Sequence, residues 1–192
     1  QIELLLNNIT VELPTPMIIK KPKPIRHNKP QIDNLHPSLM KLTHGNDPSQ
    51  ITGMTDSTLL QIISEVGTDI SKWPTVKHFT SWLGLAPNSH QSGITKKKKL
   101  FRHNSIAGQI FRISAQTLVL SKYNALGAFY RRLQAKKGKL TAMKATARKL
   151  AVIYYNVMTK GVEYVEFGIN NYEQKIKEQR IKYLQKQAIR YG

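Results

Sequence analysis

Cysteine, acidic side chains and long apolar runs are what this sequence has least of. Its 192 residues include no Cys, and only 11 Asp and Glu stand against 30 Lys and Arg. The lack of cysteine excludes a disulfide framework, a thiolate metal site and a cysteine nucleophile, and is typical of an intracellular protein. No apolar run approaches the roughly 20 residues that cross a bilayer, and the N-terminus lacks the basic-then-apolar order of a signal peptide. We therefore expect no membrane partner.

The few acidic residues are also unevenly placed. Residues 70–162 contain no Asp or Glu but 18 of the 30 Lys and Arg, in a chain of net charge +19. This charge favours a nucleic-acid partner over the alternative of a merely very soluble basic protein. A two-metal nuclease site needs several carboxylates, and His78, His90 and His103 lack the paired spacing of zinc ligands, so we expect no metal site in this window.

Apolar residues that recur every three to four positions predict a mostly α-helical fold. With their start and stop signals, the expected helices run over 59–66 to Gly67, from Pro74 to Gly84, from Asn104 or Ser105 to Leu120, over 126–133 to Gly138, from Thr141 to Gly161, and from Asn170 or Asn171 onward. The alternation typical of a strand is found at most over 162–167. The last helix is too polar for a core element, so we expect it at the periphery.

The same periodicity predicts which side chains face inward. The expected buried set is Leu59, Leu60, Ile62, Ile63 and Val66; Val76, Phe79 and Leu83; Ile106, Ile110, Ile113 and Leu120; Leu126, Phe129, Tyr130 and Leu133; and Ala142, Ala145, Leu150, Ile153, Tyr154 and Val157. We expect the aromatic rings of Tyr123, Phe129, Tyr130, Tyr154 and Tyr155 in the core rather than as platforms for stacked bases.

The segment ITGMT at residues 51–55 precedes an apolar helix and resembles the hairpin of a helix-hairpin-helix. In that motif, backbone N–H groups at a helix N-terminus receive a DNA phosphate. Thr55 stands where such a hairpin has its second glycine. A purely structural turn therefore remains an alternative.

Three regions are expected along the chain. Residues 1–34 begin with QIELLLNN, which we expect to be the end of an apolar helix of a longer polypeptide, and continue as an extended linker with five prolines and five Lys or Arg over 10–30. Residues 35–162 are predicted to form a compact helical domain with a helix-hairpin-helix-like start. Residues 163–192 are predicted to be a basic helical tail.

Ser92 lies in a setting that suits covalent phosphoryl transfer. A Ser-Gly step is followed closely by Lys96, Lys97, Lys98, Lys99 and Arg102. Such chemistry needs a nucleophilic hydroxyl and positive charge around the phosphate oxygens. A solvated loop of the same composition is the alternative reading of these residues.

A second basic cluster ends the fourth expected helix. It consists of Arg131, Arg132, Lys136, Lys137 and Lys139. Cations suit a helix C-terminus, but five together exceed what that effect requires. We expect this cluster to hold nucleic-acid phosphates.

Three ordered blocks resemble the C-terminal transposase domain of the IS110/IS1111 (IS116/IS110/IS902) family of bacterial insertion sequences. They are ITGMTDSTLLQIISEVG, WPTVKHFTSWLGLAPNSHQSG and ALGAFYRRLQAKKGKLTAMKATARKLAVIYY, and the resemblance runs from about Leu35 to Lys186. Its most specific parts are the Gly-Leu-x-Pro-x(4)-Ser-Gly core at 84–93, Phe-Tyr-Arg-Arg-Leu at 129–133 and Ala-Arg-Lys-Leu at 147–150. Lys149 in the last motif joins the candidate phosphate-binding residues. Thr52, where the family has proline, and the lysine run at 96–99 depart from the family pattern.

The resemblance to this family implies a domain composition and a reaction that the residues alone do not indicate. Family members carry an N-terminal RuvC-like domain whose acidic residues bind Mg²⁺, and the serine nucleophile they supply from this domain matches Ser92. They recombine DNA through a phosphoserine intermediate, are guided by a structured bridge RNA, and act as multimers in the bacterial cytoplasm, at the nucleoid. By this resemblance the present chain binds no cofactor itself and is inactive without the RuvC-like domain.

Two other classes of protein remain open. One is a non-catalytic helix-hairpin-helix module that binds DNA or RNA, with Ser92 an ordinary loop residue. The other is a Holliday-junction or repair protein. A strong binding preference of the chain for four-way DNA junctions over linear duplex DNA would favour this class.

The charge pattern makes a first prediction. The chain is expected to bind duplex DNA and structured RNA with strong salt dependence, because each neutralised phosphate of a duplex contributes a slope of roughly −0.9 in log K against log salt. Binding isotherms at several salt concentrations measure this slope. Affinity that barely changes between low and physiological salt would contradict the nucleic-acid reading.

Overall fold

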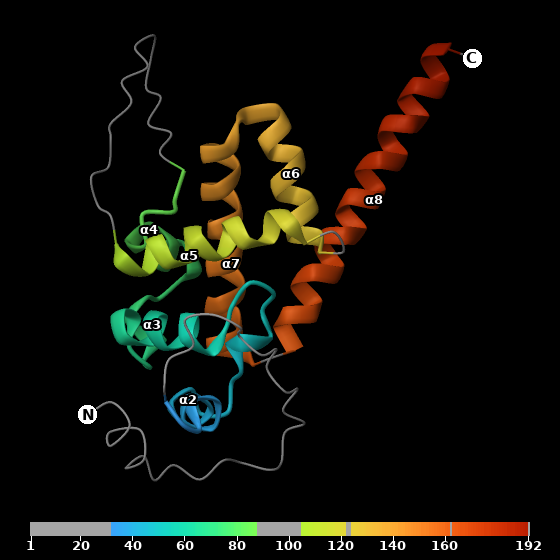
Figure 1. Ribbon diagram of the computed structural model, residues 1–192. Coiled ribbons are helices and arrows are strands. Elements are labelled where there is room, and N and C mark those ends of the chain that lie inside the picture. Colours follow the sequence, from blue (N-terminus) through green and yellow to red (C-terminus); the bar gives the residue numbers. More distant parts are fainter. Residues whose placement is uncertain (1–31, 88–104, 122–123, 162, 192) are drawn as a thin grey trace.

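The computed structural model describes residues 32–87, 105–121, 124–161 and 163–191 (Figure 1). Within these ranges the chain forms helices and no strand. The α-helices are α2 (Leu35–Leu42), α3 (Asp56–Val66), α4 (Val76–Trp82), α5 (Ile106–Thr117), α6 (Ala125–Lys137), α7 (Lys139–Lys160) and α8 (Glu163–Tyr191), with 3₁₀ turns η1 (Pro48–Gln50), η2 (Ile70–Lys72) and η3 (Leu118–Leu120). The predicted mostly helical fold is confirmed.

Side chains cap the starts of four of these helices. Thr55, Thr75, Ser105 and Asn124 accept hydrogen bonds from backbone N–H groups in the first turns of α3, α4, α5 and α6. Each cap satisfies a donor that has no partner within its helix. Ser105 is thus the cap of the predicted third helix, whereas Thr141 lies inside α7, which begins at Lys139 and has no side-chain cap.

The glycine stop signals are confirmed. Gly67, Gly84, Gly138 and Gly161 follow α3, α4, α6 and α7 with φ of 82°, 66°, 83° and 96°. A backbone with φ in this range is strained for residues that carry a Cβ, which is why glycine ends these helices.

The long helix α7 is the centre of the fold. It packs against α4, α5, α6 and α8. In Figure 1, α6 runs antiparallel beside the first half of α7, and α5 crosses in front of it. The other end of α7 lies near η1, which connects the α2–α3 region to the same core.

Aromatic rings fill the space where these helices meet. The Phe79 ring of α4 lies 6.4 Å from that of Phe111 in α5 and 6.0 Å from that of Tyr154 in α7, centroid to centroid. Tyr154 and Phe111 are themselves 5.7 Å apart, and Trp73 meets Phe79 edge-on at 5.1 Å. Such large buried rings contribute much of the apolar area that stabilises a small domain.

The orientation of α5 differs from the predicted one. Ile106, Ile113 and Leu120, all expected inward, are 59%, 55% and 87% exposed. The buried residues of the helix are Ala107, Gly108, Ile110, Phe111, Ser114 and Ala115. Gly108 explains the difference, because a Cβ there would stand 2.0 Å from the carbonyl oxygen of Leu83. At this point α5 approaches the end of α4 so closely that no side chain fits, and this contact fixes which side of the helix is packed.

The remaining predicted faces need smaller corrections. Leu60, Val76, Phe129, Leu133 and Ala145 are only half-buried, and the rest of the expected set is buried. Thr146, Ala147 and Ala151 join the buried face of α7, again as small residues.

The C-terminal helix begins earlier than expected. The predicted start at Asn170 or Asn171 is wrong, and so is a strand over 162–167, because residues 163–167 already belong to α8. Side chains from 177 to 190 are exposed, and Figure 1 shows this half of α8 projecting away from the other helices. Its expected peripheral position is confirmed. No described helix combines the length and apolar character that a membrane span would require.

The contact at Gly108 generates a prediction. Gly108→Ala is expected to lower the free energy of unfolding by about 1–3 kcal/mol, because the added carbon meets backbone that cannot move aside. Thermal or denaturant unfolding measures it. The control is Gln116→Ala on the exposed side of α5, expected to change stability by less than about 0.5 kcal/mol. A Gly108→Ala variant as stable as the parent would contradict this packing.

Candidate nucleic-acid interface

The predicted site residues fall into two groups. Ser92, Lys96, Lys97, Lys98, Lys99 and Arg102 lie outside the described residues. Arg131, Arg132, Lys136, Lys137 and Lys149 are described, on α6 and α7.

The turn between α6 and α7 is an exposed cationic tip. Arg132, Lys136, Lys137 and Lys139 are all exposed there. Apart from the residues next to it in the chain, no described atom lies within 4 Å of where a Cβ on Gly138, at the apex, would stand. The N-terminus of α7 adds the positive end of a helix dipole with no side-chain cap. We name these four residues the tip cluster; their charge and accessibility suit contact with phosphates.

Arg131 has a different role from its neighbours. Its Nη1 donates hydrogen bonds to the carbonyl oxygens of Val119 and Ser121, at 2.8 Å and 2.9 Å. These carbonyls belong to the segment that joins α5 to α6. The guanidinium therefore holds this connection, and part of its hydrogen-bonding capacity is used within the chain.

Lys149 is also engaged within the domain. Its Nζ lies 4.9 Å from the centroid of the Phe129 ring. A cation over an aromatic face is attracted by the ring quadrupole, which here links α7 to α6. The half-buried Lys149 is therefore positioned by Phe129, unlike the exposed lysines of the tip cluster.

The hairpin at residues 51–55 supports the structural-turn alternative. A Cβ on Gly53 would stand 3.1 Å from the carbonyl oxygen of Ser114 in α5, so the turn packs against the core. Asp56 occupies the first turn of α3, and its Oδ1 lies 2.8 Å from Nδ1 of His36. A carboxylate at this helix start disfavours a phosphate there.

The predicted core position is confirmed for the described tyrosines of the set, whereas Phe129 is only half-buried and lies beside Lys149. Tyr130 and Tyr154 are fully buried, and the Tyr155 hydroxyl donates to the carbonyl oxygen of Trp73 at 2.7 Å. Burial raises the pKa of Tyr154 far above its ordinary value, so this hydroxyl stays neutral at physiological pH. Tyr123 lies outside the described residues.

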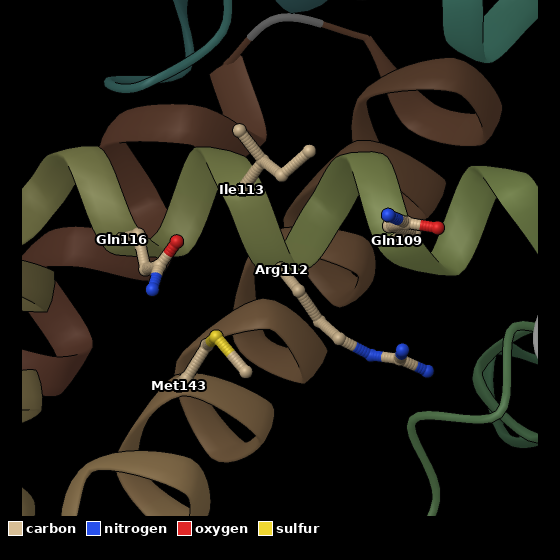
Figure 2. A pocket seen from close by; sticks show the side chains of 5 residues that line it. All are labelled: Gln109, Arg112, Ile113, Gln116 and Met143. Atoms are coloured by element: carbon tan, nitrogen blue, oxygen red, sulfur yellow. The ribbon is translucent and has the colours of Figure 1, made fainter.

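A set of polar residues on α5 was missed by the sequence reasoning. Gln109, Arg112, Ile113 and Gln116 line an open cavity of about 400 Å³ with Met143 of α7 (Figure 2). The signal was present, since Gln109, Arg112 and Gln116 recur at intervals of three and four residues. It was overlooked because the isoleucines of the same face were assigned to the core.

No group of three His, Asp or Glu side chains able to hold a metal ion occurs in the described part of the chain.

Helical packing around α7 with an exposed cationic tip defines a basic all-helical domain. Residues 49–131 of it match the family model described as Transposase IS116/IS110/IS902 family. The resemblance inferred from the sequence is confirmed over this segment, which includes Ser92 and Arg131.

Two curated relatives are similar to the chain. They are the Pilin gene-inverting proteins of Moraxella bovis and Moraxella lacunata, each 32% identical over 113 residues, which are 56% of this chain and 34% of the relative. The chain thus spans about a third of the length of these relatives. No solved structure matches it significantly.

The two kinds of basic residue lead to a prediction. Arg131→Ala is expected to lower the free energy of unfolding by about 1–2 kcal/mol, because it leaves two carbonyls without their donor. The matched change Lys136→Ala, in the tip cluster, should leave stability within about 0.5 kcal/mol. It should instead weaken DNA binding and reduce the salt slope by about 1. Unfolding and binding titrations of both variants measure these effects, and equal effects on stability would contradict the assignment.

Proposed function

We propose that this chain is the C-terminal part of a DNA transposase or recombinase that transfers phosphoryl groups through Ser92, guided by a structured bridge RNA. The observation that carries the proposal is the match of 49–131 to a transposase family model. This segment overlaps residues 70–162, which contain 18 Lys and Arg and no carboxylate side chain. DNA is the substrate in this proposal. Guide RNA and further copies of the full-length protein are its partners.

The chemistry assigned to Ser92 is a substitution at phosphorus. The serine Oγ attacks a DNA phosphate, a P–O bond to the leaving deoxyribose oxygen breaks, and the phosphate stays bound to the serine. The serine proton passes to a base and the leaving oxygen takes up a proton. Cations around the phosphate stabilise the charge on its oxygens, a role for Lys96 to Lys99 and Arg102.

A carboxylate base for this step has to come from outside residues 70–162, which contain none. We assign that role, and the binding of Mg²⁺, to the RuvC-like domain that the family resemblance implies. Phosphate binding along the DNA or the guide RNA is assigned to the tip cluster.

The test is Ser92→Ala in the full-length protein. Covalent protein–DNA adducts and recombination are expected to disappear, while DNA affinity stays nearly unchanged, because only the nucleophilic oxygen is removed. Adducts are measured by denaturing electrophoresis of labelled DNA after incubation with the protein. In the present chain by itself, no adduct is expected even with Ser92 in place.

The control is Ser89→Ala, which is expected to keep adduct formation. Ser105 is not a suitable control, because it caps α5 and its loss would cost about 1 kcal/mol of stability. Adducts that persist in Ser92→Ala would show that another residue is the nucleophile. A full-length parent protein that forms no adduct would leave the alternative of a non-catalytic DNA- or RNA-binding module.

A further inference from the structure

The outward face of α5 has the chemistry of a base-reading surface. Gln109, Ile113 and Gln116 are exposed and Arg112 is half-buried, so one side of a 12-residue helix presents two carboxamides, a guanidinium and an apolar side chain. Figure 2 shows these side chains spread along the helix, with Met143 of α7 beside them. None of them is used by the proposed chemistry at Ser92.

The partner of this face is indicated by charge. Two isoleucines more than half exposed on one helix favour a covered surface, and the positive charge of the surrounding sequence favours a polyanion as the partner. Arg112 lies on the face, and no Asp or Glu occurs anywhere between residues 70 and 162. An acidic protein surface would also be attracted by this positive charge. It would not account for the two exposed carboxamides, which carry no charge.

Base edges of duplex DNA give each of these side chains a partner. Arginine donates two hydrogen bonds to guanine, glutamine forms a bidentate pair with adenine, and apolar side chains contact the thymine methyl group. Gln109 and Gln116 are seven residues apart, about 10 Å along a helix, which corresponds to about three base pairs. The major groove of B-DNA admits a helix, whereas the deep, narrow major groove of A-form RNA does not.

Phosphate contacts are available next to this face. Lys139 of the tip cluster stands four residues before Met143 on α7, about 6 Å along the helix from the lining of the cavity. A duplex lying along α5 would bring its backbone toward the tip cluster. In this arrangement the tip cluster would position the duplex through its phosphates, and the face of α5 would specify the sequence through the bases.

We propose that the exposed face of α5 reads the sequence of duplex DNA in the major groove through Gln109, Arg112 and Gln116. This inference rests on the proposed function, since it names how the same protein would recognise its DNA directly, in addition to any guidance by RNA.

The experiment is a selection with the full chain from two pools. One pool contains DNA duplexes with a randomised central segment, and the other contains RNA hairpins with randomised stems. The DNA pool is expected to yield an enriched motif of about three adjacent base pairs. Gln109→Ala and Gln116→Ala are each expected to reduce the preference at one position of the motif by about 10- to 100-fold and to leave the other positions unchanged.

Two controls make the result specific. Lys137→Ala, in the tip cluster, is expected to weaken binding of all sequences alike, because phosphate contacts carry no sequence information. Melting curves of the glutamine variants are expected to match the parent, since both side chains are exposed.

Three outcomes would overturn the inference. They are DNA binding without any sequence preference, a preference that all of Gln109→Ala, Arg112→Ala and Gln116→Ala leave unchanged, and a preference found only in the RNA pool. In the first two, salt-dependent DNA binding would persist and the proposed function would stand. A chain that binds neither pool at any salt concentration would overturn both.

Discussion

The fold depends on how closely α5 approaches the end of α4. At Gly108 the two backbones come so near that no side chain fits between the helix and the Leu83 carbonyl. This approach brings Phe111 to the rings of Phe79 and Tyr154, and so joins α4, α5 and α7 in one core. It also fixes the rotation of α5 about its axis. Glycine, alanine and serine residues are turned inward together with Ile110 and Phe111, while two glutamines, an arginine and two other isoleucines are turned outward.

Local signals in the sequence predicted the ends of four helices and the start of α5. Ser105 and four glycines act through their own side chain or the lack of one, so their effect does not depend on the rest of the fold. The inward face of α5 could not be predicted in this way. Counting apolar residues favours isoleucine for the core, whereas close helix packing selects glycine and alanine, and only the tertiary structure reveals which constraint applies. The early start of α8 was missed for a similar reason, because Val162 to Phe167 alternates like a strand.

Net charge predicted a binding surface but not the roles of single cations. Arg131 and Lys149 look like their neighbours in sequence, yet one bridges two carbonyls and the other lies over an aromatic ring. The tip cluster is exposed instead, at the apex of the α6–α7 turn. A basic residue near a helix end is therefore informative only once its hydrogen-bond partners are known. Glutamine carries no charge, so an analysis of the charged residues did not predict the polar face of α5.

The boundaries of α4 and α5 have a consequence for how this protein can diverge. α4 ends at a glycine stop, and α5 begins at a serine that caps its own first turn. Both signals are local, so the helical scaffold needs no information from the residues that connect them. The segment between them, which carries Ser92 and the lysine run, can therefore exchange residues without removing either signal. Related chains can then differ in this segment while they keep the two helices that flank it.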